Sequence, residues 1–343
     1  MKKDRLVLID VLRILFMVFI FIRHSATMGG CKYTWFDVPF LRSLNGNMLS
    51  AFFIISGFSL FYVYSNKDLF NYDNLTIFYK KRVISILPFY LLVVICHFFL
   101  ESDLKTNMGL LPIEITGTHT FFNNTFSLLH NGTTWFVSCL LLSIFLFPLL
   151  QELIKRFSPK KRIILFVLLL TFLSYSSIMF NMFSITNTYS NPLFRNFEFS
   201  LGVLFCSMIK TPSDNSKNWL YLLGFFGGVA LLFYISKYST NIILLVKYLV
   251  MLIPIFFAAK YKPNPNRKYR IISFGALISY PFYILQDLIW NKNKWLNDLI
   301  RQISNNYLRI LTFLGILIAL CVITTYFYQK PIEKLFKRKN EKT

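Results

Sequence analysis

Long apolar stretches recur along the whole chain and are separated by shorter polar segments. Each is about twenty residues long, the length that a helix needs to cross the hydrocarbon core of a bilayer. The sequence lacks the alternating segments of about ten residues that are typical of membrane β-barrels. The pattern therefore predicts an all-α, polytopic transmembrane helical bundle with about ten spans. The expected spans are 6–26, 41–64, 83–100, 134–154, 163–181, 192–209, 219–236, 241–259, 271–290 and 308–329.

Basic residues are distributed unevenly between the two sets of loops that these spans define. Of the 37 Lys and Arg residues, 25 lie in the terminal segments and in alternate loops, and seven lie in the loops between them. Cytoplasmic loops of membrane proteins carry the excess of Lys and Arg, so we expect both termini in the cytoplasm. The net charge of +22 therefore reflects topology and does not indicate a nucleic-acid partner.

The composition agrees with a membrane protein, because 55% of the 343 residues are hydrophobic and 18% are aromatic. The five cysteines are scattered and include no C-x-x-C pair, so we expect neither a disulfide framework nor a metal site. The basic N-terminus resembles a signal peptide, but its apolar run is long and has no small-residue cleavage site. We expect one integral-membrane domain over residues 1–343, with a retained first span and no added soluble domain.

The first span carries ionisable residues inside its apolar run, where such groups are costly and are functional candidates. Arg13 and His24 are about three helical turns apart, so their side chains leave nearly the same face, ~16 Å apart along the axis. Asp10 lies one turn before Arg13 and can form an ion pair with it. Two interpretations stay open. The residues belong to a functional site, or the pair is only structural and His24 lies in the interfacial belt.

One loop on the expected outer side, at about 101–133, is long enough to be a lid or a binding segment. Its ionisable candidates are Glu101, Asp103, Glu114, His119 and His130. The loop could shape an acceptor site, or it could be a polar connector. None of its histidines has the spacing of a metal-ligand set.

Five segments, in this order, resemble motifs of the acyltransferase 3 family of membrane-bound, acyl-CoA-dependent acyltransferases. They are IDVLR at 9–13 followed after ten residues by His24, FFIISGF at 52–58, FYKKRVISILPFY at 78–90, the tryptophan-led span at 135–150, and GALISYPFYILQ at 275–286. The resemblance extends from residue 9 to about residue 331. The matching residues that are intact are Asp10, Arg13, His24, Ser56, Gly57, Arg82 and Trp135.

The chain departs from the family pattern at four positions. Ser85 stands where many members have a second arginine, and Leu140 replaces a glutamate that is common in one branch. Gln286 stands where a histidine is frequent, and Gln329 stands where a glutamate often precedes the proline. These departures indicate a divergent branch of the family.

The resemblance implies an O-acyltransferase of the cytoplasmic membrane, in a bacterium, with acetyl as the expected acyl group. The donor would be acyl-CoA, and the acceptor a hydroxyl of a cell-surface polysaccharide or of its lipid-linked precursor. Arg13, Arg82 and Lys81 are expected to bind the phosphates of acyl-CoA, because guanidinium and ammonium groups suit phosphate. His24 is expected to act as general base, or as a nucleophile through an acyl-histidine. We expect membrane lipid as a partner and no permanently bound cofactor, and the oligomeric state is left open.

Several further residues are supporting candidates. Asp287 or Glu198 could orient the catalytic imidazole. The alternatives are an interfacial position for Asp287 and, for Glu198, an ion pair with Arg195 one turn before it. Tyr280 and Gln286 lie in the fifth matching segment.

Three other residues have a structural alternative. Ser56 and Gly57 are better explained by close helix packing than by a nucleophile. Trp135 could stack on a sugar ring or anchor the interface.

A rival class for the whole chain is an exporter or flippase of a surface polysaccharide, but the repeated halves of many transporters are not evident.

Overall fold

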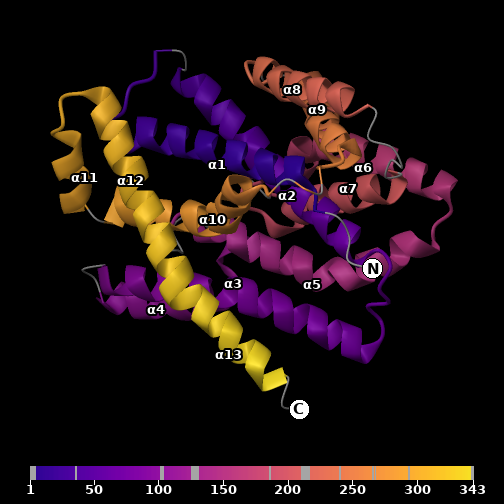
Figure 1. Cartoon of the computed structure of the whole chain (residues 1–343), viewed down its shortest axis with the longest axis horizontal. Coiled ribbons are helices and arrows are strands. Elements are labelled where there is room, and N and C mark those ends of the chain that lie inside the picture. The colour runs from indigo at the N-terminus through magenta and orange to yellow at the C-terminus, as the bar shows by residue number, and fades with distance from the viewer. Residues whose placement is uncertain are drawn as a thin grey trace.

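The structure of the chain is a computed structural model that describes residues 5–34, 37–100, 104–124, 131–184, 187–209, 217–238, 241–264, 266, 268–292 and 294–340. Every regular element within these ranges is helical, and no strand occurs among them (Figure 1). The α-helices are α1 (Val7–Thr27), α2 (Val38–Tyr64), α3 (Tyr72–Leu100), α4 (Leu104–Ile115), α5 (Thr134–Arg156), α6 (Pro159–Met182), α7 (Pro192–Met208), α8 (Asn218–Ile235), α9 (Asn241–Lys260), α10 (Arg270–Asp287), α11 (Lys294–Arg301), α12 (Asn306–Thr324) and α13 (Lys330–Asn340). One 3-10 helix, η1 (His119–Phe121), and two π-helices, η3 (Leu288–Lys292) and η4 (Thr325–Gln329), complete the set.

A long helix covers each of the ten apolar stretches of the sequence: α1, α2, α3, α5, α6, α7, α8, α9, α10 and α12. Six segments in the described part of the chain are long and apolar enough to cross a membrane: 40–64, 72–100, 134–156, 218–235, 270–290 and 306–336. The all-α, multi-pass membrane fold is therefore confirmed, whereas the number of ten spans stays a prediction. α1 is outside the six, and it carries Asp10, Arg13 and Arg23 within its length.

The first and last described segments lie at one end of the bundle. Arg5 donates a hydrogen bond to Ser273 in the first turn of α10. Gln329, directly before α13, donates to the Ile84 carbonyl in the first half of α3. We call this the basic end, because Lys80 and Lys81 also lie there. Its cytoplasmic orientation stays a prediction from the charge bias.

Several helices in the described part of the chain begin at a residue whose side chain caps the free backbone N–H groups. A helix N-terminus leaves these donors unpaired, and a short side-chain oxygen can accept from them. Asp37, Ser158, Asn191 and Asn305 accept in this way at the starts of α2, α6, α7 and α12. A proline in the first turn of α2, α6 and α7 suits positions with no internal acceptor.

Two glycines allow α2 and α7 to pack with their backbones in contact. A Cβ atom on Gly57 would lie 2.0 Å from the Phe199 carbonyl oxygen, and one on Gly202 would lie 1.9 Å from the Ile54 carbonyl oxygen. Small residues at a membrane helix interface permit this close approach. Ser56 donates to the Phe52 carbonyl of its own helix at 2.7 Å, a local bond that fits the packing interpretation of this motif.

We expect Gly57→Ala to lower the stability of the purified protein by about 1–3 kcal/mol, because the added methyl group must push two backbones apart. The matched control is Gly227→Ala on α8, where nothing lies within 4 Å of the new Cβ atom. That change should be neutral or slightly stabilising, by about 0.5–1 kcal/mol, because alanine favours a helix. Equal unfolding temperatures for the two variants would contradict the assignment.

The described part of the 101–133 loop is packed structure. α4 lies against α3, where the Tyr90 hydroxyl donates to the Glu114 carbonyl. The side chains of Glu114 and His119 are fully buried. Burial lowers the pKa of His119 to about 4, so its ring is neutral at pH 7. The other loop candidates, Glu101, Asp103 and His130, lie outside the described residues.

Candidate functional site

His24 lies in the last turn of α1 and contacts Gln286 near the end of α10. The Nδ1 atom of His24 is 2.7 Å from the Gln286 Oε1 atom, and both side chains are buried. With the Gln286 amide in this orientation its oxygen accepts the hydrogen bond, so Nδ1 carries the ring proton and donates it. The lone pair of the neutral imidazole is therefore on Nε2, which is the form a general base requires.

A cavity of about 500 Å³ opens beside His24, and we call it the His24 cavity. It is built where the ends of α1 and α10 meet the starts of α2 and α5 and the segment before α7. Its lining residues are Arg23, His24, Met28, Arg42, Asn45, Leu49, Gly132, Thr133, Trp135, Tyr189, Tyr283, Asp287 and Trp290. The volume is within the range of small-molecule sites. Residues 132 and 133, the end of the long loop, thus contribute to its wall.

Asp287 lines the same cavity and contacts residues of α3 and of the segment before α5. Its Oδ2 atom accepts from the Gly132 backbone N–H at 3.2 Å and lies 3.5 Å from Nε2 of His97. Nδ1 of His97 is 2.9 Å from the Val93 carbonyl one turn earlier on α3. Asp287 therefore ties the ends of α3 and α10 to the start of α5, and the imidazole of His24 is held by an amide.

We expect Gln286→Leu to lower kcat about 10- to 100-fold, a range typical of losing the partner that orients a functional histidine. The KM for the acyl-CoA donor that the sequence resemblance implies should change little, because Gln286 contacts the histidine and lies far from the basic end. The pH profile of kcat should also shift, since the proton on Nδ1 loses its acceptor. Unchanged kcat and pH dependence in Gln286→Leu would show that the contact has no catalytic importance.

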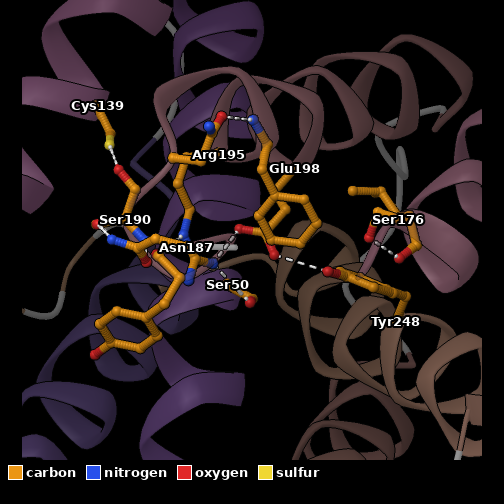
Figure 2. Close-up of polar contacts among 12 residues, drawn as sticks. Ser50, Cys139, Ser176, Asn187, Ser190, Arg195, Glu198 and Tyr248 are labelled. Atoms are coloured by element: carbon orange, nitrogen blue, oxygen red, sulfur yellow. Dashed lines mark hydrogen bonds and ion pairs between the residues drawn. The ribbon is translucent and has the colours of Figure 1, made fainter. Parts of the chain in front are cut away.

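A buried ion pair lies on α7, behind the aromatic residues of the cavity, and Figure 2 shows its polar contacts. Arg195 donates from Nη1 to Glu198 at 2.7 Å and to Ser50 at 3.0 Å, and the Tyr248 hydroxyl donates to the second Glu198 oxygen at 2.8 Å. Glu198 therefore forms the ion pair with Arg195 that local spacing favours, and it does not reach His24.

The same guanidinium also holds the cavity aromatics. Arg195 donates from Nε to the Tyr189 carbonyl at 2.8 Å, and its centre lies 5.5 Å from the ring centroids of Trp135 and Tyr189. The rings of Trp135 and Tyr189 are 4.8 Å apart. Because Trp135 is 2% exposed and lines the cavity, it does not face the lipid as an interfacial anchor would.

Arg13 lies toward the basic end of α1 in a network of its own. Asp10 accepts from Arg13 at 3.1 Å and from Arg5 at 2.7 Å, so the predicted ion pair is present and is shared with a second arginine. Arg13 also donates to Ser59 on α2 at 2.8 Å. The charge of Arg82 is near enough to act on Arg13. The structure thus groups these two guanidinium groups near the basic end.

Lys81 lies elsewhere, on another face of α3. It is exposed and lines a second cavity of about 940 Å³ between α3 and α13, together with Lys80 and Glu333. The guanidinium of Arg82 instead lies over the rings of Tyr64 and Phe78, at 5.5 and 5.9 Å. The three basic residues expected to bind one donor therefore do not line one cavity.

Apolar side chains fill the interval between Arg13 and His24 along α1. Phe16, Met17 and Ile20 lie on this face of the helix and are 1%, 6% and 1% exposed. The ring of Phe16 packs edge-on against Phe52, with centroids 5.8 Å apart. The His24 cavity does not extend to Arg13.

Gln329 and Ser85, two of the four departures from the family pattern, form hydrogen bonds that explain their side chains. Pro88 in α3 cannot donate to the Ile84 carbonyl, and Gln329 supplies the missing N–H at 2.9 Å. An ionised glutamate at this position could not donate this bond. Tyr280 donates in a similar way to the Ile86 carbonyl at 3.1 Å. The hydroxyl of Ser85 bonds to the Arg82 carbonyl of its own helix at 3.0 Å.

Several cavity residues were not singled out from the sequence: Arg42, Asn45, Tyr189, Tyr283 and Trp290. They come from three separate stretches of the chain, and only the tertiary fold brings them together. Arg23, next to His24, is one of the ionisable residues of the first apolar run that the sequence itself indicates as functional candidates. In the described part of the chain, no three His, Cys, Asp or Glu side chains meet as a metal site would require.

Comparison with known proteins gives one match. A family model described as an acyltransferase domain matches residues 6–328, nearly the whole chain. No curated protein and no solved structure matches it. The matched region includes both α1, with Arg13 and His24, and α10, with Gln286.

Proposed function

Because the chain belongs to the acyltransferase 3 family and is a multi-pass membrane protein, we propose that it transfers an acyl group, with acetyl as the expected one, from cytoplasmic acyl-CoA to a glycan hydroxyl on the outer side of the membrane. The acceptor is a cell-surface polysaccharide or its lipid-linked precursor, and the membrane is the cytoplasmic membrane of a bacterium. The observation that carries the proposal is the bond from His24 to Gln286, because it leaves Nε2 free to act as a base beside the His24 cavity.

In the proposed reaction His24 is the general base. Its Nε2 atom takes the proton of the acceptor hydroxyl while the hydroxyl oxygen attacks the carbonyl carbon of the thioester. The tetrahedral intermediate then collapses, the carbon–sulfur bond breaks, and the CoA thiolate takes the proton back from the imidazolium. The acyl oxygen ester and CoA are the products, and no other reactant is needed.

The donor is proposed to bind at the basic end. Arg13 and Arg82 supply guanidinium groups, which bind phosphate through paired hydrogen bonds. From there the thin pantetheine arm would extend ~16 Å along α1 to His24. Phe16, Met17 and Ile20 occupy this path. The arm therefore enters only when these side chains move aside, and the flexible side chain of Met17 is the best suited to do so.

The experiment uses the purified full chain in lipid vesicles, with acetyl-CoA labelled in the acetyl group and isolated surface glycan as acceptor. The proposal expects label in the glycan, in a form that mild alkali releases as an ester. Glycan that crosses the vesicle membrane without gaining label would instead support an exporter. Label that is found only as free acetate would refute transfer to glycan.

We expect Arg13→Ala to weaken the binding of acyl-CoA about 10- to 100-fold, because one charge-assisted hydrogen-bond pair to phosphate is lost. The matched control is Arg156→Ala, an exposed arginine whose ion pair with Glu152, at 2.9 Å, lies away from α1. Titration of each purified variant with a non-hydrolysable acyl-CoA analogue measures both affinities. Equal affinities in the two variants would remove Arg13 from donor binding.

A further inference from the structure

Two guanidinium groups at the His24 cavity have no acidic partner among the residues that the structure describes. Arg23 directly precedes His24 on α1, Arg42 lies in the first turns of α2, and both line the cavity. Within the described residues neither one forms a side-chain hydrogen bond or an ion pair, and the Nε atom of Arg23 is buried without a partner. The buried Nε atom of Arg23 is costly to keep without a hydrogen-bond partner, so a ligand is the expected source of that partner.

Asp287 is the one carboxylate among the described lining residues, and it does not neutralise these groups. Asp287 is held by the Gly132 backbone N–H and faces Nε2 of His97. With His24 neutral, the lining residues that the structure describes carry two positive charges and one negative charge. The cavity therefore favours an occupant with a negative charge.

The remaining lining groups suit a sugar ring. Trp135, Tyr189, Tyr283 and Trp290 supply aromatic surfaces against which the C–H face of a pyranose can pack. Asn45 Oδ1 and Trp290 Nε1 are polar atoms without hydrogen-bond partners in the described structure. Each of the two residues is only 3% exposed, so these atoms are also shielded from solvent. They are an acceptor and a donor of the kind that ring hydroxyls satisfy.

We propose that the acceptor is an anionic sugar, which carries a carboxylate or phosphate group close to the hydroxyl that is acylated. Arg23 and Arg42 bind the anionic group, and the aromatic residues bind the ring. This inference specifies the acceptor of the proposed acyl transfer. It rests on that proposed function only for the transfer step, because anion-selective binding can be measured without catalysis.

The binding experiment follows the tryptophan fluorescence of the purified full chain, because Trp135 and Trp290 both line the cavity. The probes are glucuronate, glucose 1-phosphate and glucose. We expect at least one anionic sugar to bind about tenfold or more tightly than glucose, the gain of one charge-assisted contact. The preferred sugar shows whether carboxylate or phosphate is the natural group. Equal affinities, or binding of none of the three probes, would overturn the proposal.

Arg23→Gln and Arg42→Gln should each remove most of this preference, and the exposed position of Arg42 makes its variant the safer one for folding. The control is Lys237→Gln, which removes one positive charge from an exposed site away from the cavity lining and should retain the preference. A preference that survives both arginine changes would contradict the assignment.

A second experiment measures the rate of acyl transfer to two acceptors. One is a glucuronate-containing oligosaccharide, and the other is the same oligosaccharide after reduction of its carboxylates to alcohols. Faster acylation of the charged form supports the inference, and equal or slower acylation overturns it. Anion-selective binding without transfer to any glycan would leave the anion site standing and refute the proposed acyltransferase activity instead.

Discussion

Replacing His24 with alanine is expected to lower the rate of acyl transfer to glycan by about 10²–10⁴-fold, the usual contribution of a general base. The variant should still insert into the membrane and accumulate, because His24 borders a cavity and its loss leaves Gln286 as the main unpaired group. The measurement is single-turnover transfer of labelled acetyl from acetyl-CoA to glycan by the purified variant. Acyl-CoA affinity should be unchanged, since the proposed donor phosphates bind near Arg13.

Added imidazole provides a sharper readout for the same variant. The space left by the ring joins a cavity of about 500 Å³, so free imidazole has room to enter and take the proton. Partial recovery that rises with imidazole concentration supports a general base. Full activity of His24→Ala without imidazole would remove His24 from the chemistry altogether.

Replacing Glu198 with alanine is expected to have the largest effect on stability, a loss of about 3–5 kcal/mol. The change leaves Arg195 buried and charged, although its bonds to Ser50 and to the Tyr189 carbonyl stay. Because Arg195 supports Trp135 and Tyr189, the acceptor side of the His24 cavity should also deform. Thermal unfolding of the purified protein in one detergent measures the loss.

Two comparison variants separate the buried charge from simple loss of packing. Arg195→Met together with Glu198→Leu removes both charges and should recover much of the stability. Ser176→Ala removes a buried hydroxyl that bonds to the Leu173 carbonyl at 2.7 Å, and it should cost about 1 kcal/mol. A double variant that is less stable than Glu198→Ala would contradict this expectation and would show that the Arg195–Glu198 ion pair itself stabilises the fold.

The helical architecture was predictable because apolar runs of membrane length leave few other structures. Each predicted span coincides with a helix, yet α1 is not apolar enough by composition to be counted as a span. Its charged residues Asp10, Arg13 and Arg23 are the reason, and they are also what made the segment a functional candidate. The charged residues that lower the hydropathy of α1 are therefore the same residues that indicate a functional site.

The candidate site was predictable only where residues are close in sequence. The Asp10–Arg13 and Arg195–Glu198 pairs follow from one helical turn of spacing, and both are present. The partner of His24 was not predictable in this way, because Gln286 is 262 residues away along the chain. The two carboxylates considered for that role, Glu198 and Asp287, have closer partners of their own.

The packed side chains of Phe16, Met17 and Ile20 have a consequence for the cell as well as for the enzyme. Under the proposed orientation, the cluster around Arg13 faces one compartment and the His24 cavity faces the other. A continuous hydrated passage between them would conduct protons and small ions and dissipate the membrane potential. The apolar interval blocks that leak while the enzyme is idle, and during turnover the donor arm itself would fill the opening.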